Sequence, residues 1–514
     1  MTLRKDNRRG NPSLWVLAAA RWHTSATIQT PVIQWSIAVS LGLALGFFLL
    51  IALAWNSRWA PFLALAALFP FIAIISGDLR KFLLMVLLLE LPMNLDLALL
   101  YDVHAVELNA TGGLSYSITG FCLVCLYALW FIDLLIQKST SPRLLPSSLP
   151  LLIYLAAVVL SMAVAQDRWL AAFEIFLLGQ SFLLFIYIIK TVQNRQDLLF
   201  VVTLLLAGLA YESVVMIGLR ILGHSVRFAH IMAGIDASGR VYGTIGSPNT
   251  AASYLTLLLA PTLSVLLTTL KAPYKWLAGL AFGLGTAALL LTFSRGGWLA
   301  FIISIALLCL FAFFRGWLSP GVPLVIAASS MVLVLLLWKP ITDRLFGDDL
   351  GAAQSRSIMW KQALQVIEAN PVLGVGSNNY AIWYEQRYSS TTIQPVHFLI
   401  GTKTFWYEQH FKAEIDGRIL RTVHNKFLLV WAETGIIGLV TFLGFLFAVI
   451  RWGWQGWQLQ DRLLSPLALG FTVAIVGQMV HMCFDLFHSR PQIQLLWVVA
   501  ALVIAIRNMD ASDG

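Results

Sequence analysis

The chain has 514 residues, of which 59% are hydrophobic and 11% are charged, and its mean hydropathy is +0.79. Because soluble domains carry charge at about a quarter of their positions, this composition excludes an ordinary soluble protein and indicates an integral membrane protein. The net charge of +9 comes from basic residues scattered between apolar runs rather than from a continuous basic stripe, so no nucleic-acid partner is expected.

Residues 1–32 are basic and lack a signal-peptide cleavage pattern, so they are predicted to form a retained cytoplasmic tail. Runs of about 20 apolar residues then predict an all-α membrane protein with about fourteen spans. Eleven spans form a bundle over residues 33–338, and three more lie in residues 425–514. The predicted spans are 34–55, 59–76, 82–100, 117–137, 148–165, 170–190, 197–219, 249–270, 273–292, 298–314, 320–338, 425–450, 463–487 and 491–506.

The distribution of Lys and Arg between the spans predicts the orientation. With the N-terminus in the cytoplasm, seventeen of these residues fall on the inner side, whereas the short outer loops hold only four: Arg58, Arg168, Arg295 and Arg490. This asymmetry follows the positive-inside rule. Both termini are therefore expected in the cytoplasm of a multi-pass inner-membrane protein.

Residues 339–424 form the one large loop between predicted spans, and the orientation places this loop outside. Apolar residues at helical spacing predict an amphipathic helix that ends at Pro371 and packs on the membrane surface or on the bundle. The positions in this pattern are Ile358, Met359, Ala363, Val366 and Ile367. Farther on, Asp416-Gly417 between alternating residues predicts a hairpin that leads to His424 at the next span.

Ionisable residues inside the predicted spans indicate which side of the membrane is active. Asp96, Glu174, Glu212 and Asp485 fall in the outer halves of their spans, and Asp133 alone lies near the inner side. Charged groups within a bilayer are costly and usually functional. A transporter needs polar groups through both halves of the membrane, so this distribution favours chemistry at the outer face.

The segment "LTFSRGGWLA" places Arg295 at the predicted outer start of a span. A helix N-terminus offers unpaired N–H groups and a positive dipole end, and Gly296 and Gly297 are expected to let a ligand approach the backbone. The alternative is a tight turn whose arginine reaches the lipid headgroups.

Two further segments repeat this arrangement. In "GRVYGTIGSPNTAASYL", Arg240 precedes a turn in which Pro248 and Asn249 are good helix-starting residues. In "RTVHNKFLLVWAETGIIG", Arg421 and His424 precede a span. Three such helix starts at one face predict an anion site, and a pair of guanidinium groups suits a diphosphate.

These segments, together with "SRSIMWKQALQVIEANPVLGVGSNNY", resemble the bacterial O-antigen ligases and the related O-antigen polymerases over roughly residues 240–490. The resemblance implies a GT-C-like helical bundle that transfers glycans from a polyprenyl-diphosphate carrier at the periplasmic face. It also implies that Arg240 and Arg295 bind the diphosphate, that His424 is the essential histidine, and that Asp485 is an acidic site residue. Arg356, Arg421 and Asn425 are secondary candidates.

We therefore predict a membrane glycosyltransferase whose partners are a lipid-linked glycan donor, a lipid or glycan acceptor, and membrane lipids. His424, at a helix N-terminus near like charges, is expected to stay neutral and to act as a general base, with Asp485 a better orienting carboxylate than Glu433. The sequence contains no metal-ligand cluster and no Gly-rich nucleotide loop, so no cofactor is expected. The alternatives are a polysaccharide polymerase of the same superfamily and a solute or bicarbonate transporter.

Overall fold

The computed structural model describes residues 78–102, 105–106, 109–137, 146–228, 231–318, 352–388, 397–401 and 422–510, together with a few single positions. The chain forms two compact units, residues 1–82 with 125–141 and residues 83–124 with 142–514. Except for Arg421, which lies outside the described residues, every candidate site residue is described and belongs to the second unit. The basic tail 1–32 and the predicted hairpin at 416–417 also lie outside the described residues.

Ten helices in the described part of the chain are long and apolar enough to cross a membrane, which confirms a mostly helical membrane protein. They match ten of the predicted spans. These helices are α6 (Ile118–Gln137), α7 (Leu149–Ser161, with a short 3-10 turn at each end), α8 (Arg168–Thr191), α9 (Arg195–Leu222), α10 (Pro248–Leu266), α11 (Ala272–Leu291), α12 (Arg295–Phe314), α18 (Lys426–Trp457), α19 (Leu464–Met482) and α20 (Arg490–Asp510).

The predicted span over 82–100 is wrong. Helix α4 (Leu79–Glu90) ends just before Pro92, which cannot continue a helix without losing a hydrogen bond, and the chain then forms strand β1 (Leu97–Asp102). The polar residues Asn94 and Asp96 interrupt the apolar run at this point. The predicted spans 59–76 and 320–338, and all but single positions of 34–55, lie outside the described residues.

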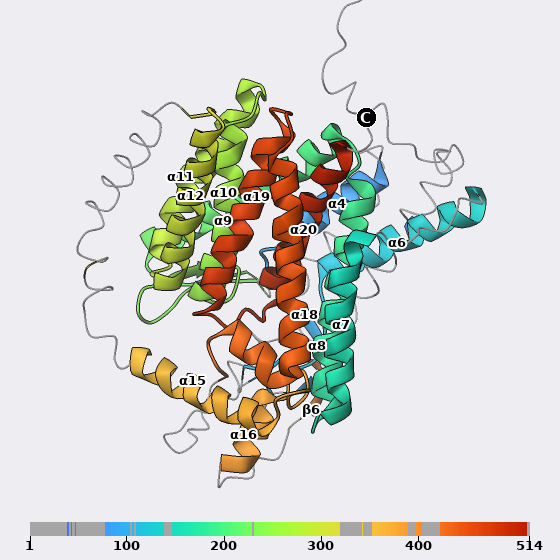
Figure 1. Cartoon of the computed structure of the whole chain (residues 1–514), viewed down its shortest axis with the longest axis vertical. Helices are drawn as coiled ribbons and strands as arrows, with labels where there is room; N and C mark the ends of the chain where they lie inside the picture. The colour runs from blue at the N-terminus through green and yellow to red at the C-terminus, as the bar shows by residue number, and fades with distance from the viewer. Residues whose placement is uncertain are drawn as a thin grey trace, which may run out of the picture. The chain divides into compact units, whose positions relative to one another are not determined.

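The centre of the second unit is formed by α10, α19 and α20, which are the most buried of these helices. Helix α10 packs on α19, α12 packs on both, and α18 and α20 complete the contacts of α19, as the side-by-side ribbons in Figure 1 show. Glycines let these helices approach closely: a Cβ atom at Gly477 would lie 1.9 Å from the Ser304 hydroxyl of α12. Small residues at helix contacts are typical of membrane bundles.

Two small antiparallel sheets lie between the helices, and the sequence did not predict them. The first has the order β2-β1-β6, with β2 at Leu114–Tyr116 and β6 at His397–Gly401, so a strand of the large loop pairs with β1 near the N-terminal end of the unit. The second consists of β3 (Val226–Phe228), β4 (Ile231–Ile235) and β5 (Val241–Gly243), between α9 and α10.

The large loop contains α15 (Ala352–Ala369) and α16 (Tyr380–Tyr388). The predicted amphipathic helix is therefore confirmed, and Figure 1 shows α15 crossing near the start of α18. Its buried face joins a hydrophobic cluster with Leu429 and Ala432 of α18, so the helix packs on the bundle. Ile358 departs from the predicted pattern, since 49% of its surface is exposed. The buried positions of α15 are Met359, Ala363, Val366 and Ile367.

Helix α18 is broken at Gly435, whose φ of 67° and ψ of −172° are not helical. The segment 371–376 inserts beside the break and supplies the missing backbone partners. Val375 N donates to Ala432 O at 3.0 Å, Gly376 N donates to Glu433 O at 2.9 Å, and Ile436 N donates to Pro371 O at 2.9 Å. Such pairing lets irregular backbone exist within a membrane bundle.

The asparagines that follow this segment fix the loop to the rest of the unit. Asn378 donates to the backbone oxygens of Thr111 and Leu170 at 2.8 and 2.9 Å, and it accepts from Thr111 N at 2.7 Å. Asn379 pairs in the same way with both backbone groups of Asp167. The motif "VLGVGSNNY" thus holds the loop against α8 and α18 through buried amide contacts.

Candidate functional site

The two predicted arginine motifs meet at Asn249, near the start of α10. The guanidinium group of Arg240 donates through Nη2 to Asn249 Oδ1 at 2.9 Å and through Nε to Thr292 O, at the end of α11, at 2.9 Å. The hydroxyl of Ser294, the N-cap of α12, donates to the same Asn249 oxygen at 3.0 Å. Asn249 therefore links Arg240 to the turn that carries Arg295.

A short turn between β4 and β5 presents Arg240. Arg240 N donates to Asp236 Oδ1 at 2.9 Å, and Asp236 N donates to Arg240 O at 2.9 Å, which closes the turn around Ser238 and Gly239. The Asp236 carboxylate thus accepts a hydrogen bond from the backbone of its own turn. The Arg240 side chain is directed to α10 and α11. This hairpin could not be assigned from hydropathy because its strands are only three and five residues long.

Arg295 is the first residue of α12 and is half-buried. The predicted role of the two following glycines needs correction. A Cβ atom at Gly297 would lie 2.6 Å from the Cβ of Ala252 in α10, and one at Gly296 would lie 3.1 Å from Cδ2 of His481 in α19. The glycines therefore allow three helices to pack closely around Arg295, rather than leaving open backbone for a ligand.

The predicted helix starts are confirmed, and each has a side-chain cap. Ser247 accepts from Thr250 N at the start of α10, and Ser294 accepts from Gly297 N at the start of α12. Asn425 accepts from Phe427 N and Leu428 N at 3.0 and 3.1 Å at the start of α18. Asn425, a secondary site candidate, thus serves as a helix cap.

His424 directly precedes this cap and is half-buried. Its neighbour Val423 and the neighbour of Asp485, Leu486, belong to one hydrophobic cluster, so the two predicted site residues flank the same packed core. Asp485 is buried, and its Oδ2 accepts from Gln492 Nε2 at 2.8 Å. Glu433 makes a contact with the large loop instead: its Oε1 accepts from Tyr380 N at 3.4 Å.

His481 is a further candidate site residue, which the sequence reasoning missed. It is 1% exposed, and its ring lies beside Gly296, where a Cβ atom would be 3.1 Å from its Cδ2. It lies four residues before Asp485, which is just beyond the end of α19, and a second titratable residue so near the end of a span was a usable signal. Arg356, a secondary candidate, lies on α15 and is half-buried.

Residues 280–443 match the protein-family model described as O-antigen ligase. The matched segment contains Arg295, Arg356 and His424, while Arg240 and Asp485 lie outside it. No curated protein matches the chain. The match confirms the resemblance seen in the sequence over this segment: residues 280–443 of this membrane protein are similar to the O-antigen ligase family.

Proposed function

We propose that the protein transfers a glycan from a polyprenyl-diphosphate-linked donor to an acceptor hydroxyl at the outer face of the cytoplasmic membrane, as an O-antigen ligase does. The observation that carries this proposal is the contact of Asn249 with both Arg240 and Ser294. It joins two arginine-bearing turns, from segments 55 residues apart, at the starts of α10 and α12.

The arginine pair supplies what a diphosphate leaving group needs. The Asn249 contacts bring together two turns that each carry an arginine, at the positive N-terminal ends of two helices. This charge stabilises the negative charge that develops on the diphosphate as its bond to the anomeric carbon breaks. In this proposal the arginines take the role that a divalent metal has in many glycosyltransferases.

His424 is the proposed general base. The acceptor oxygen attacks the anomeric carbon, its proton passes to a ring nitrogen of His424, and the carbon–oxygen bond to the diphosphate breaks with its electron pair leaving on the carrier. Asp485 would orient the imidazole or balance its charge. The shared cluster of Val423 and Leu486 supports this pairing because it holds the two segments together.

The test is a transfer assay with purified protein and the lipid-linked glycan extracted from cells that lack this protein. A charge-assisted hydrogen bond is worth about 1.5–3 kcal/mol, so Arg295→Ala should weaken donor binding about 10- to 150-fold. Arg295→Lys should also be impaired, because it keeps the charge but loses the planar fork. Loss of transfer on adding EDTA, or full activity of Arg295→Ala, would contradict the arginine assignment.

His424→Ala should bind the donor normally but slow transfer by about 10²- to 10⁴-fold, the usual contribution of a general base. Near wild-type transfer by this variant would exclude His424 as the base. The products distinguish the alternatives: a ligase adds one preassembled glycan to an acceptor, whereas a polymerase lengthens the lipid-linked chain by repeat units. Uptake of solute into vesicles without any transfer would favour a transporter.

A further inference from the structure

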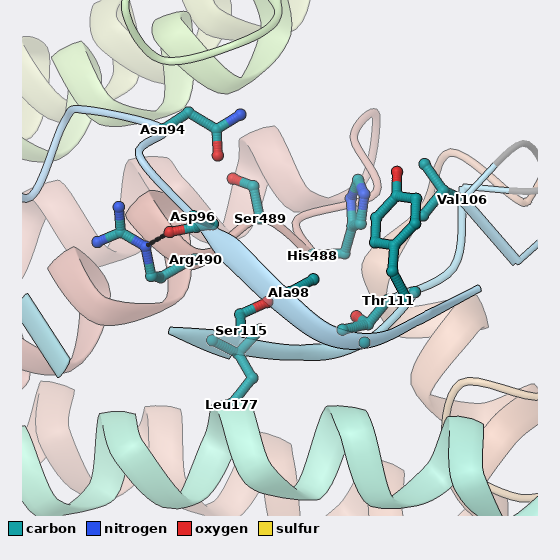
Figure 2. A pocket seen from close by; sticks show the side chains of 13 residues that line it. Asn94, Asp96, Ala98, Val106, Thr111, Ser115, Leu177, His488, Ser489 and Arg490 are labelled. Carbon is teal, nitrogen blue, oxygen red and sulfur yellow. Dashed lines mark hydrogen bonds and ion pairs between the residues drawn. The ribbon is translucent and has the colours of Figure 1, made fainter. Parts of the chain in front are cut away.

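A polar pocket lies beside the proposed reaction centre, between strands β1 and β2 and the connection from α19 to α20. Figure 2 shows Asn94, Ser489 and His488 on one side of β1, with Ser115 on the neighbouring strand. The cavity volume is about 50 Å³. Because one water needs roughly 10–15 Å³ by this measure, the pocket has room for a few water-sized groups.

Arg490 borders the pocket but cannot bind an anion there. Its side chain is 1% exposed, and its three nitrogens donate to Asp96 at 2.6 Å, to both oxygens of Glu90 at 2.8 and 3.2 Å, to Gln494 and to the backbone of Met93. All five N–H groups of a guanidinium are used by such a set of acceptors. Arg490 is therefore a structural part of the pocket wall and is not available to a ligand.

The groups that remain suit neutral hydroxyls. The carboxamide of Asn94 and the hydroxyl of Ser115 have no hydrogen-bond partners among the residues that the structure describes, and the Asp96 side chain is 20% exposed at the pocket. An amide donates and accepts, and a carboxylate accepts, which is the combination that pairs with the vicinal hydroxyls of a sugar.

The pocket adjoins the proposed diphosphate site through two sets of contacts. On one side, Asn94 N donates to Thr244 O at 3.1 Å, and a Cβ atom at Gly246 would lie 2.9 Å from Asn94 Nδ2, so the pocket touches the turn before α10. On the other side, Ser489 donates to Gln492 at 2.9 Å, and Gln492 donates to Asp485.

The second set of contacts connects the pocket to the proposed site residues. Gln492 joins the pocket wall at Ser489 to Asp485, and His481, four residues before Asp485, lies beside Gly296. The pocket wall is therefore hydrogen-bonded, through Gln492, to the carboxylate that is proposed to orient His424. In a transfer reaction the acceptor oxygen faces the anomeric carbon while the base takes its proton, so a pocket joined to the proposed base and its carboxylate is placed to hold the acceptor.

We propose that this pocket binds the hydroxyl-bearing edge of the acceptor's sugar residue and sets which acceptor is used. The inference rests on the proposed glycosyl transfer.

The experiment measures transfer and donor binding separately, with donor and cell-surface lipid extract both taken from cells that lack the protein. Asn94→Ala should raise the acceptor concentration needed for half-maximal rate by about three- to tenfold, the effect of losing one or two neutral hydrogen bonds. Ser115→Phe should raise it at least tenfold by filling the pocket, while Ser115→Ala, which leaves the space open, should change it much less. Donor affinity should stay at the wild-type value in all three variants.

The outcomes separate the pocket proposal from the proposed function. If the wild type transfers glycan and Asn94→Ala and Ser115→Phe use the acceptor normally, the pocket proposal is wrong and the function stands. If these variants weaken donor binding instead, the pocket holds a donor sugar, which also overturns the proposal. If the wild type neither binds the donor nor transfers glycan, the proposed function is wrong, and the acceptor-pocket proposal, which rests on it, is wrong as well. Unchanged donor affinity in Asn94→Ala also shows that the protein remains folded.

Discussion

Asn249→Ala tests whether the arginine pair works as one unit. Asn249 Oδ1 is the acceptor for Arg240 Nη2 at 2.9 Å and for Ser294 Oγ at 3.0 Å. Its loss removes the side-chain acceptor and keeps the bond from Arg240 Nε to Thr292 O. The charge-assisted bond is worth about 1.5–3 kcal/mol. If that energy serves to hold Arg240 in its binding position, donor affinity should fall by about 10- to 150-fold.

The assay is donor binding by purified protein, measured for Asn249→Ala, Arg240→Ala and the double variant. If Asn249 acts through Arg240, the double variant should bind no more weakly than Arg240→Ala alone, because residues in one network are not additive. Helix α10 keeps its cap in every variant, since Ser247 supplies it. Additive losses of affinity, or unchanged affinity in Asn249→Ala, would refute the reasoning.

Three further predictions follow from the fold. In a cysteine-free background, Glu368→Cys on α15 should react with an impermeant thiol reagent in intact cells, and Ala272→Cys at the start of α11 should not. The reverse pattern would show that the predicted orientation in the membrane is inverted. Asp485→Asn should lower the transfer rate while donor affinity is kept, and an unchanged rate would remove Asp485 from the site. Gly374→Ala should lower the thermal stability of the detergent-solubilised protein, by at least about 1–2 kcal/mol, because its φ is +68° and a Cβ atom would lie 2.3 Å from the backbone of Glu433. Gly283→Ala, in helix α11 with nothing within 4 Å, is the matched control and should be neutral or slightly stabilising.

Hydropathy was sufficient to predict the ten described membrane helices, because a spanning helix must be continuous, apolar and about 20 residues long. The same criterion failed at residues 82–100. There, Pro92 and the polar residues Asn94 and Asp96 lie inside an apolar run, and the pairing of β1 with β6 joins segments about 300 residues apart. Window averages contain no information on such long-range pairing.

The candidate site was predictable in part. Ser294, Pro248 and Asn425 mark helix starts by local chemistry, and the structure confirms all three starts. The meeting of Arg240 with Asn249 and Thr292 could not be predicted, because it depends on how α10 and α11 pack. His481 was overlooked since a lone histidine in an apolar helix is usually a core residue, although its spacing from Asp485 was a signal.

The break at Gly435 has a consequence for how the large loop can be altered. Segment 371–376 provides backbone partners for Ala432, Glu433 and Ile436, so removing the loop would leave polar peptide groups of α18 unpaired. The loop and the first turns of α18, which directly follow His424, therefore form a single structural module. A chimaera that exchanges the loop between relatives should keep its fold only if residues 371–379 and 423–436 come from the same parent protein.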